Sequence, residues 1–314
     1  MKIAFVFPGQ GSQSLGMMQS FAQLPGVRET FFEASDAIGQ DLWKLVEAGP
    51  ADDLNLTLNT QPVMLTAGIA LYRAWTASGG ALPMVVAGHS LGEYSALVAG
   101  GALDFADAVA LVRFRAQQMQ DAVPEGVGAI AAILGLEDDV VRATCLEASG
   151  NGEIAEAANY NSPAQVVIAG NAGAVQRAME IAKAKGAKRA IMLPMSVPSH
   201  CSLMRPAAER LRERLRTVEL RRPTVPVLHN ADVKSAESAD AIRDALVRQL
   251  SQPVRWVETI RAIVSAGATD VVECGPGRVL AGLGKRIATQ TPTHSFADEP
   301  AFRQALAALH AREN

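Results

Sequence analysis

The chain is organised around residues 84–99, which read MVVAGHSLGEYSALVA. The stretch starts with a short apolar run that includes Val85 and Val86, and then meets Gly88, Ser90 and Gly92 at alternate positions. Small and apolar residues follow at helical spacing to its end. This pattern predicts a buried strand, a tight turn and a helix, a unit of α/β folds.

The two glycines have a steric explanation. A side chain at Gly88 or Gly92 would collide with the strand or the helix where the chain reverses around Ser90. In such a turn, a nucleophile elbow, a strained serine presents its hydroxyl outward and the helix N-terminus faces a developing oxyanion. The alternative is an ordinary glycine-rich turn with a capping serine, since G-x-S-x-G also occurs by chance.

The composition is that of a globular chain. Its 314 residues suffice for two domains or one large domain. Hydrophobic residues make up 49% and charged residues 19%, which excludes an intrinsically disordered protein. The net charge of -3 carries no electrostatic signal for nucleic acid, so binding of DNA or RNA is not expected.

Nothing in the sequence predicts export or a membrane span. The apolar run at the N-terminus is short and stops at Pro8, and no later stretch reaches the length of a span. The chain has three cysteines, Cys145, Cys201 and Cys274. An odd number without CxxC spacing disfavours a disulfide framework and a zinc site. We therefore expect a soluble cytoplasmic protein with no metal, no cofactor and no membrane partner.

A second glycine-rich loop follows the first predicted strand. Residues 3–7 form an apolar run, and PGQGSQ follows at 8–13. The loop lacks the Gly-x-x-x-x-Gly-Lys and G-x-G-x-x-G spacings, so nucleotide binding is not expected. A loop at the carboxyl end of a strand is nonetheless where α/β sheets place ligands.

The order of elements predicts an α/β-hydrolase-like large domain with a parallel sheet. Apolar residues recur at helical spacing over 26–38 and 62–77, where Thr60 offers a cap and Pro62 suits a first helical turn. These helices lie between two strands, as in a parallel sheet covered by helices. Further strands are expected at 226–230 and 269–274, followed by an exposed tail from Thr289 with one short helix.

A second pattern begins at Gly126. Strands are expected at 129–134, 154–158, 166–169 and 189–193, and helices at 137–148 and 174–185. That order, βαββαβ, is the ferredoxin-like unit. We therefore divide the chain into a large α/β-hydrolase-like domain, residues 1–125 and 196–314, and an inserted ferredoxin-like small domain, residues 126–195.

A serine nucleophile needs a base, and the chain has five histidines. His89 adjoins the serine and should point away, and His294 and His310 lie in the predicted tail. Of the remaining two, His200 is preferred over His229, because it follows the serine in the order usual for elbow enzymes and sits in a loop with two prolines. No aspartate stands out between serine and histidine, so a backbone carbonyl or an amide could orient the imidazole.

Arg115 lies on a helix predicted from a cap at Asp104 to about Met119. It falls about 70 degrees from the centre of the apolar stripe, on the flank of the buried face. A partly buried arginine needs a carboxylate partner. The ordinary explanations are a snorkelling side chain or an internal salt bridge.

The helix expected at 203–216 carries five arginines and two glutamates. Two explanations stay open. The residues form a solvated face of Glu-Arg pairs, or they form a basic rim for an acidic partner protein.

Together these segments resemble one family, the malonyl-CoA:acyl carrier protein transacylases of bacterial fatty acid synthesis. The resemblance covers nearly the whole chain and rests on several separate motifs in the same order. They are FPGQGSQ at 7–13, GHSLGE at 88–93, PSH at 198–200, RQL at 248–250 and GPG at 275–277. The βαββαβ insertion also resembles that family's small subdomain.

The resemblance implies a role for each matching residue. Ser90 would be the nucleophile and His200 its base, and the main-chain carbonyl of Gln249 would hold the imidazole, which accounts for the missing aspartate. The oxyanion hole would consist of the backbone N-H groups of Leu91 and Gln10. Gln10 would also contact the substrate.

The resemblance also implies the substrates. Arg115 would bind the free carboxylate of the malonyl group, in place of the ordinary explanations given above. Malonyl-CoA and acyl carrier protein would be the partners. The malonyl group would pass from coenzyme A to the serine and then to the phosphopantetheine thiol of the carrier, a ping-pong transfer without a cofactor.

Other functions stay open. The acyltransferases of polyketide synthesis and malonate decarboxylase share the elbow. A serine hydrolase, either an esterase or a thioesterase, shares it too, and there water releases the acyl group. A non-enzymatic module that docks a carrier protein is disfavoured by the intact Ser90, His200 and Arg115.

Overall fold

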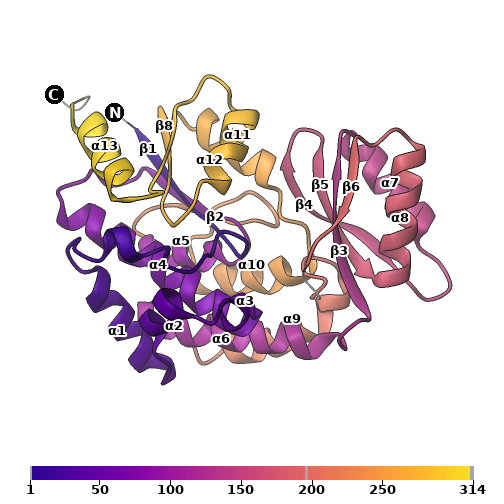
Figure 1. Ribbon diagram of the computed structural model, residues 1–314, viewed down its shortest axis with the longest axis horizontal. Helices are drawn as coiled ribbons and strands as arrows, with labels where there is room; N and C mark the ends of the chain where they lie inside the picture. The colour runs from indigo at the N-terminus through magenta and orange to yellow at the C-terminus, as the bar shows by residue number, and fades with distance from the viewer. Residues whose placement is uncertain (1, 195–196, 312–314) are drawn as a thin grey trace.

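The computed structural model describes residues 2–194 and 197–311, which form two lobes (Figure 1). The larger lobe contains a sheet covered by helices, and the smaller lobe contains a second sheet with two helices on its outer side. No helix in these residues is both long enough and apolar enough to cross a membrane. The predicted junction at 195–196 lies outside the described residues, and the predicted domain limits stay a prediction.

A five-stranded parallel sheet forms the centre of the larger lobe, in the order β7-β2-β1-β8-β9. The strands are β1 Ile3–Phe7, β2 Val85–Gly88, β7 Val227–Leu228, β8 Asp270–Glu273 and β9 Thr293–Ser295. All five residues of the central β1 are buried, which explains its unbroken apolar sequence. The α/β fold predicted from the sequence is confirmed.

Helices cover both faces of this sheet. Phe5 and Phe7 of β1 belong to one core and Ala4 and Val6 to a second, as the alternation of side chains along a strand requires. The helices that contribute to the first core are α1 Val27–Ile38, α2 Leu42–Ala48, α3 Ala51–Asn55, α4 Thr57–Ala77, α5 Gly92–Ala99, α6 Phe105–Ala122, α9 Arg205–Leu215, α10 Ala239–Ser251 and α13 Glu299–His310. The second core is completed by α11 Trp256–Ser265 and α12 Val279–Ile287.

The smaller lobe has the predicted βαββαβ order. Its antiparallel sheet runs β4-β5-β3-β6. The elements are β3 Gly128–Leu134, α7 Asp138–Ala148, β4 Ala155–Ser162, β5 Gln165–Asn171, α8 Ala172–Ala184 and β6 Arg189–Met192. The two helices bury one face of the sheet, and the other face packs around Cys201 of the larger lobe. The small sheet therefore lies against the loop that carries the preferred histidine.

The start of α4 was predicted incorrectly. The helix begins at Thr57, and Pro62 lies inside it rather than in the first turn. Thr60 does not cap the helix, because its hydroxyl donates to the carbonyls of Leu54 and Leu56 at 2.6 and 3.0 Å. The earlier start brings Thr57 and the next turn of α4 to the candidate site described below.

The predicted exposed tail was also wrong. Residues 293–295 add β9 to the edge of the large sheet, and α13 buries Phe302 against Phe296 and Trp75. His294 bonds to Asp270 through Nε2 at 3.0 Å. The three-residue strand is polar and half-buried, so it lacks the apolar run by which strands are predicted.

Candidate active site

Ser90 occupies a strained turn between β2 and α5. Its φ of 52° lies in the left-handed region, which costs a residue other than glycine roughly 1–2 kcal/mol. A Cβ at Gly88 would lie 1.8 Å from the carbonyl carbon of Gly92, and a Cβ at Gly92 would lie 2.0 Å from the carbonyl oxygen of Phe7. Both positions therefore exclude any side chain, as the elbow pattern predicts.

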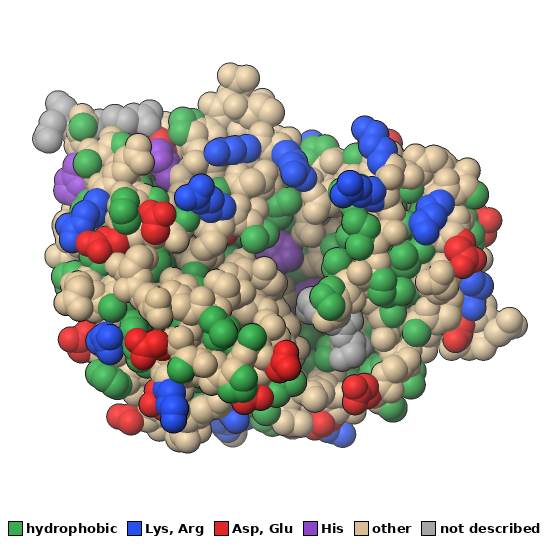
Figure 2. Space-filling model, in the orientation of Figure 1, with side chains coloured by type: hydrophobic (Ala, Val, Ile, Leu, Met, Phe, Trp, Pro, Cys, Tyr) green, Lys and Arg blue, Asp and Glu red, His purple; other side chains and the backbone are tan. Residues whose placement is uncertain are grey.

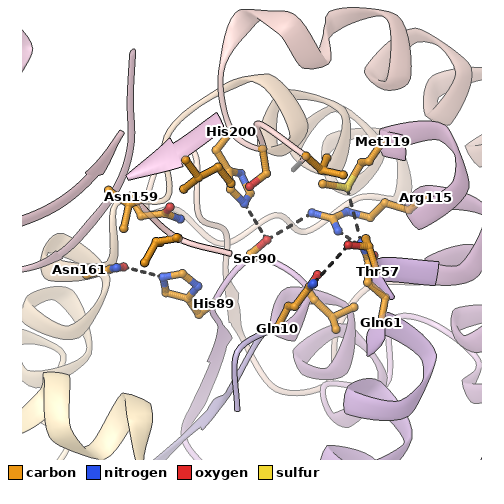
Figure 3. A pocket seen from close by; sticks show the side chains of 16 residues that line it. Gln10, Thr57, Gln61, His89, Ser90, Arg115, Met119, Asn159, Asn161 and His200 are labelled. Atoms are coloured by element: carbon orange, nitrogen blue, oxygen red, sulfur yellow. Dashed lines mark hydrogen bonds between the residues drawn. The ribbon is translucent and has the colours of Figure 1, made fainter. Parts of the chain in front are cut away.

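The imidazole of His200 meets the serine hydroxyl. The Oγ of Ser90 and the Nε2 of His200 are 2.7 Å apart (Figure 3). The Nδ1 of His200 lies 2.8 Å from the main-chain oxygen of Gln249. A carbonyl oxygen only accepts hydrogen bonds, so Nδ1 carries the proton and Nε2 is free to accept the serine proton. The structure thus brings together three residues that lie far apart in the sequence.

Burial keeps His200 neutral. Its side chain is buried, and desolvation, helped by the positive charge of Arg115, lowers the pKa of His200 to about 3. The hydrogen bond from Nδ1 to the Gln249 carbonyl opposes this shift but does not cancel it. An imidazole that stays unprotonated near neutral pH can act as a general base.

The other candidate bases are engaged elsewhere. The Nδ1 of His229 lies 2.7 Å from a carboxylate oxygen of Glu93 beneath the elbow. The Nε2 of His89 points away from Ser90 to Asn161 at 2.8 Å (Figure 3), although His89 does line the cavity. Neither ring has a hydrogen bond to the serine hydroxyl in the described part of the chain.

Arg115 projects from α6 to the serine and is 1% exposed. Its Nη1 donates to the amide oxygen of Gln61 at 2.8 Å, and Nη2 donates to the amide oxygen of Gln249 at 3.0 Å and to the Ser90 hydroxyl at 3.3 Å. No ion pair with a carboxylate among the described residues accompanies these bonds. Burial lowers the pKa of Arg115, but a guanidinium remains charged in proteins. The guanidinium is therefore oriented by neutral groups, and the nearest carboxylate that acts on it, Glu93, makes no direct contact with it.

A cavity of about 160 Å³ opens beside the serine between the two lobes. Gln10 and Gln61 line it from the larger lobe, and Ile130 of β3 and Val167 of β5 line it from the smaller lobe. Figure 2 shows this face hollowed between the lobes, with a histidine side chain visible there. Across residues 2–194 and 197–311, no group of three or more His, Cys, Asp and Glu residues is placed to hold a metal ion.

Two backbone N-H groups are candidate oxyanion donors. Leu91 immediately precedes α5, and Gln10 follows β1 in the glycine-rich loop; both line the cavity. Neither N-H donates a hydrogen bond to another described residue. The side chain of Gln10 donates to the hydroxyl of Thr57 at 3.2 Å, which holds the loop against α4.

Sequence reasoning missed several polar residues of this site. They are Thr57, Gln61, Asn159, Asn161, Glu93 and Asn230. A usable signal existed for Gln61, because a glutamine within the apolar helical run of α4 is 1% exposed and must find partners in the core. No comparable periodic signal marked Asn161 or Asn230. Asn161 lies on the edge strand β4, and Asn230 lies in the loop after β7.

Two of the five arginines in and just after α9 pair with glutamates of the same helix. Arg212 bonds to Glu209 at 3.2 Å and Arg216 to Glu213 at 2.8 Å. This is the arrangement expected for a solvated face. Arg210 and Arg214 lack acidic partners among the described residues and bond instead to neutral side chains.

The fold and the serine, histidine and arginine geometry define a serine enzyme of acyl transfer. Residues 4–306 match the family described as acyl transferase domain. The malonyl CoA-acyl carrier protein transacylase of Escherichia coli strain K12 is 54% identical over 309 residues, which cover 98% of this chain and 99% of that protein.

Solved structures agree with this assignment. An acyl-carrier-protein S-malonyltransferase from Burkholderia pseudomallei 1710b is 59% identical, with a TM-score of 0.96 and coverage of 98% of this chain and 100% of that chain. A malonyl-transacylase in complex with a type II PKS acyl-carrier protein is 50% identical, with the same TM-score and coverage. The chain belongs to the malonyl CoA-acyl carrier protein transacylase family, which confirms the resemblance found in the sequence.

Proposed function

We propose that this chain transfers the malonyl group of malonyl-CoA to the phosphopantetheine thiol of acyl carrier protein. The product, malonyl-acyl carrier protein, is then used in fatty acid synthesis. The observation that carries the proposal is the buried Arg115. Its guanidinium forms no ion pair with a described carboxylate and lies 3.3 Å from the Ser90 hydroxyl. A substrate that ends in a carboxylate supplies a direct ionic partner for it.

In the first half-reaction, Ser90 attacks the thioester carbonyl of malonyl-CoA. The Nε2 of His200 takes the hydroxyl proton as the Oγ-carbon bond forms, and the carbonyl oxygen becomes an oxyanion. The backbone N-H groups of Leu91 and Gln10 donate to this oxyanion. The carbon-sulfur bond then breaks, and the coenzyme A thiol leaves with the proton held by His200.

Arg115 selects the acyl group and orients it. Its planar fork presents parallel N-H groups to a carboxylate, and the amide oxygens of Gln61 and Gln249 hold the fork in place. The carboxylate is thus bound on one side of Ser90, and the thioester carbonyl is directed to the serine oxygen.

The second half-reaction reverses the chemistry with another thiol. The phosphopantetheine thiol of the carrier gives its proton to His200 and attacks the malonyl ester. The ester bond to Ser90 breaks, and the serine oxygen recovers the proton from His200. One malonyl group is transferred, and the enzyme returns to its starting state.

Intact-protein mass spectrometry distinguishes this transfer from hydrolysis. Protein mixed with malonyl-CoA alone should carry a malonyl group on Ser90 that persists until the holo carrier protein is added and then moves to it. Ser90→Ala should carry none. Ser95→Ala, which removes a buried serine hydroxyl one turn further along α5, is the matched control and should be labelled like the parent. Prompt release of free malonate without the carrier would favour a serine hydrolase.

A polyketide role is the second candidate, because a similar malonyl-transacylase is seen with a type II PKS acyl-carrier protein. Transfer rates to a fatty acid carrier and to a polyketide carrier from the same cell would separate the two pathways. A kcat/KM at least as high for the fatty acid carrier is expected. A clear preference for the polyketide carrier would reverse the assignment.

The proposal includes a cytoplasmic location. All three cysteines are buried free thiols, as is usual in a reducing compartment. Burial raises the pKa of Cys145 and Cys201 to about 12, so these thiols are poor nucleophiles. Cell fractionation followed by immunoblotting tests the location directly.

A further inference from the structure

The strained backbone of Ser90 is clamped by side chains from a distant loop and a distant helix. The N-H of Ser90 donates to Oδ1 of Asn230 at 2.7 Å, and Nδ2 of Asn230 donates to the carbonyl of Gly88 at 2.6 Å. The carbonyl of Ser90 accepts from Nε2 of Gln249 at 2.8 Å. A left-handed residue other than glycine persists only where its surroundings hold it.

Asn230 is itself rigidly held. It is fully buried, and its own N-H donates to Oε2 of Glu93 at 2.9 Å. The same carboxylate oxygen accepts from Nε2 of Gln249 at 3.0 Å, and Oε1 of Glu93 bonds to His229 at 2.7 Å. Glu93 therefore ties the loop after β7 and the end of α10 to the first turn of α5, just behind the nucleophile.

The clamp needs a side chain that offers both an acceptor and a donor, and the amide of Asn230 supplies them. The Ser90 N-H can only donate and the Gly88 carbonyl can only accept, so the partner must offer one acceptor and one donor on the same planar group. Those partners also determine which atom of the amide is oxygen. An aspartate has the acceptor but lacks the donor when ionised, and alanine lacks both.

We propose that Asn230 is a positioning residue for the nucleophile, whose amide bridges the Ser90 N-H and the Gly88 carbonyl and so keeps Ser90 Oγ within 2.7 Å of His200 Nε2. The inference rests on the proposed function, because it assigns a role in the same reaction. Asn230 does not line the cavity and acts on the reaction through Ser90.

Two variants and a matched control test the role of Asn230. Asn230→Ala removes both bonds, and we expect kcat to fall about tenfold to a hundredfold while the KM for malonyl-CoA stays nearly constant, since an error of about 1 Å in a reacting atom can cost about a hundredfold. Asn171→Ala is the control. Asn171 also accepts a backbone N-H, that of Ile154 at 2.9 Å, but it lies in the smaller lobe away from the cavity. This control should leave kcat unchanged.

Asn230→Asp separates positioning from general stability. Burial and the nearby Glu93 should raise the pKa of the new carboxyl group. When protonated, that carboxyl group offers one acceptor and one donor, like the amide. Activity relative to the parent should therefore rise as the pH falls from 8 to 5, and the low pKa of His200 keeps the base competent over this range. A loss of stability alone would not produce such recovery.

The rate at which a small sulfonyl fluoride modifies Ser90 gives a readout that does not depend on the malonyl substrate. We expect it to fall in both Asn230 variants and not in the Asn171 control. An unchanged modification rate in Asn230→Asp at pH 8, or a pH profile parallel to that of the parent, would overturn the inference. If the parent forms no malonyl-serine but the modification rates still differ as expected, then the proposed function fails and the positioning role stands.

Discussion

Replacement of Arg115 should erase the preference for a malonyl group over an acetyl group. Malonyl and acetyl thioesters share the reacting carbonyl and differ in the terminal carboxylate. The guanidinium of Arg115 is the buried cation beside Ser90, and it is already oriented by Gln61 and Gln249 at 2.8 and 3.0 Å. The substitution Arg115→Ala removes that cation while Ser90 and His200 remain.

The size of the effect follows from the strength of one charged interaction. A hydrogen bond to a charged group contributes about 1.5–3 kcal/mol, and each 1.4 kcal/mol corresponds to a factor of about ten. The ratio of kcat/KM for malonyl-CoA to that for acetyl-CoA should therefore fall about tenfold to a hundredfold. The variant should also be less stable, because the buried amide oxygens of Gln61 and Gln249 lose a donor, at about 1–3 kcal/mol each.

A competition assay with both thioesters, read as acyl groups on Ser90 by mass spectrometry, measures the ratio directly. Arg113→Ala is the matched control, since Arg113 lies on the same helix and bonds to Gln40 outside the cavity. Arg115→Lys keeps the charge without the planar fork, and an intermediate ratio is expected. An unchanged malonyl to acetyl ratio in a folded Arg115→Ala protein would refute the assigned role of this residue.

Three further outcomes are expected. Because the pKa of His200 is lowered to about 3, the rate of Ser90 acylation should not decline between pH 7 and pH 5, and a decline centred near pH 6.5 would contradict the assignment of the base. Burial raises the pKa of Glu273 from its usual 4.5 to about 7, so the folded protein binds more protons than the unfolded chain between these values and loses stability as the pH rises through them. Urea unfolding of Glu273→Gln should consequently show a smaller loss of stability from pH 5 to pH 8 than the parent; equal losses would count against the raised pKa. Replacement of Arg210 and Arg214 by glutamate should raise the KM for acyl carrier protein several-fold without affecting Ser90 acylation by malonyl-CoA, if α9 is the basic rim that electrostatic steering requires; unaltered carrier kinetics would leave α9 as a solvated face.

Much of the fold could be predicted because its signals are local. The strand, turn and helix around Ser90 lie within residues 84–99, and the βαββαβ order could be read from the periodicity of consecutive segments. The predicted start of α4 failed because a competing short-range interaction uses the same hydroxyl. Thr60 looked like a helix cap, but its hydroxyl instead satisfies carbonyls of Leu54 and Leu56 at the end of the preceding helix.

The candidate site was predicted unevenly for the same reason. Ser90 could be singled out from the sterics of its neighbours and His200 from its order in the chain and its proline-containing loop, whereas the role of Arg115 came only from the resemblance to a known family. The side-chain contacts that hold them were missed, and Gln249 was singled out only for its main-chain carbonyl. Asn230 and Gln249 act through hydrogen bonds to the backbone of a residue more than a hundred positions away, and such pairings leave no periodic pattern.

The sequence alone determined the elbow, because any side chain at Gly88 or Gly92 would overlap backbone atoms only a few residues away or on the adjoining strand. The tertiary structure decided which histidine reaches the serine hydroxyl. His200 and His229 both follow the elbow in the chain, and both end near it. The loop before α9 carries His200 to the serine hydroxyl, 110 positions away in the sequence, whereas β7 pairs with β2 and directs His229 to Glu93 beneath the turn. The pairing order of the strands and the burial of each ring set this difference, and both arise only when distant segments pack together.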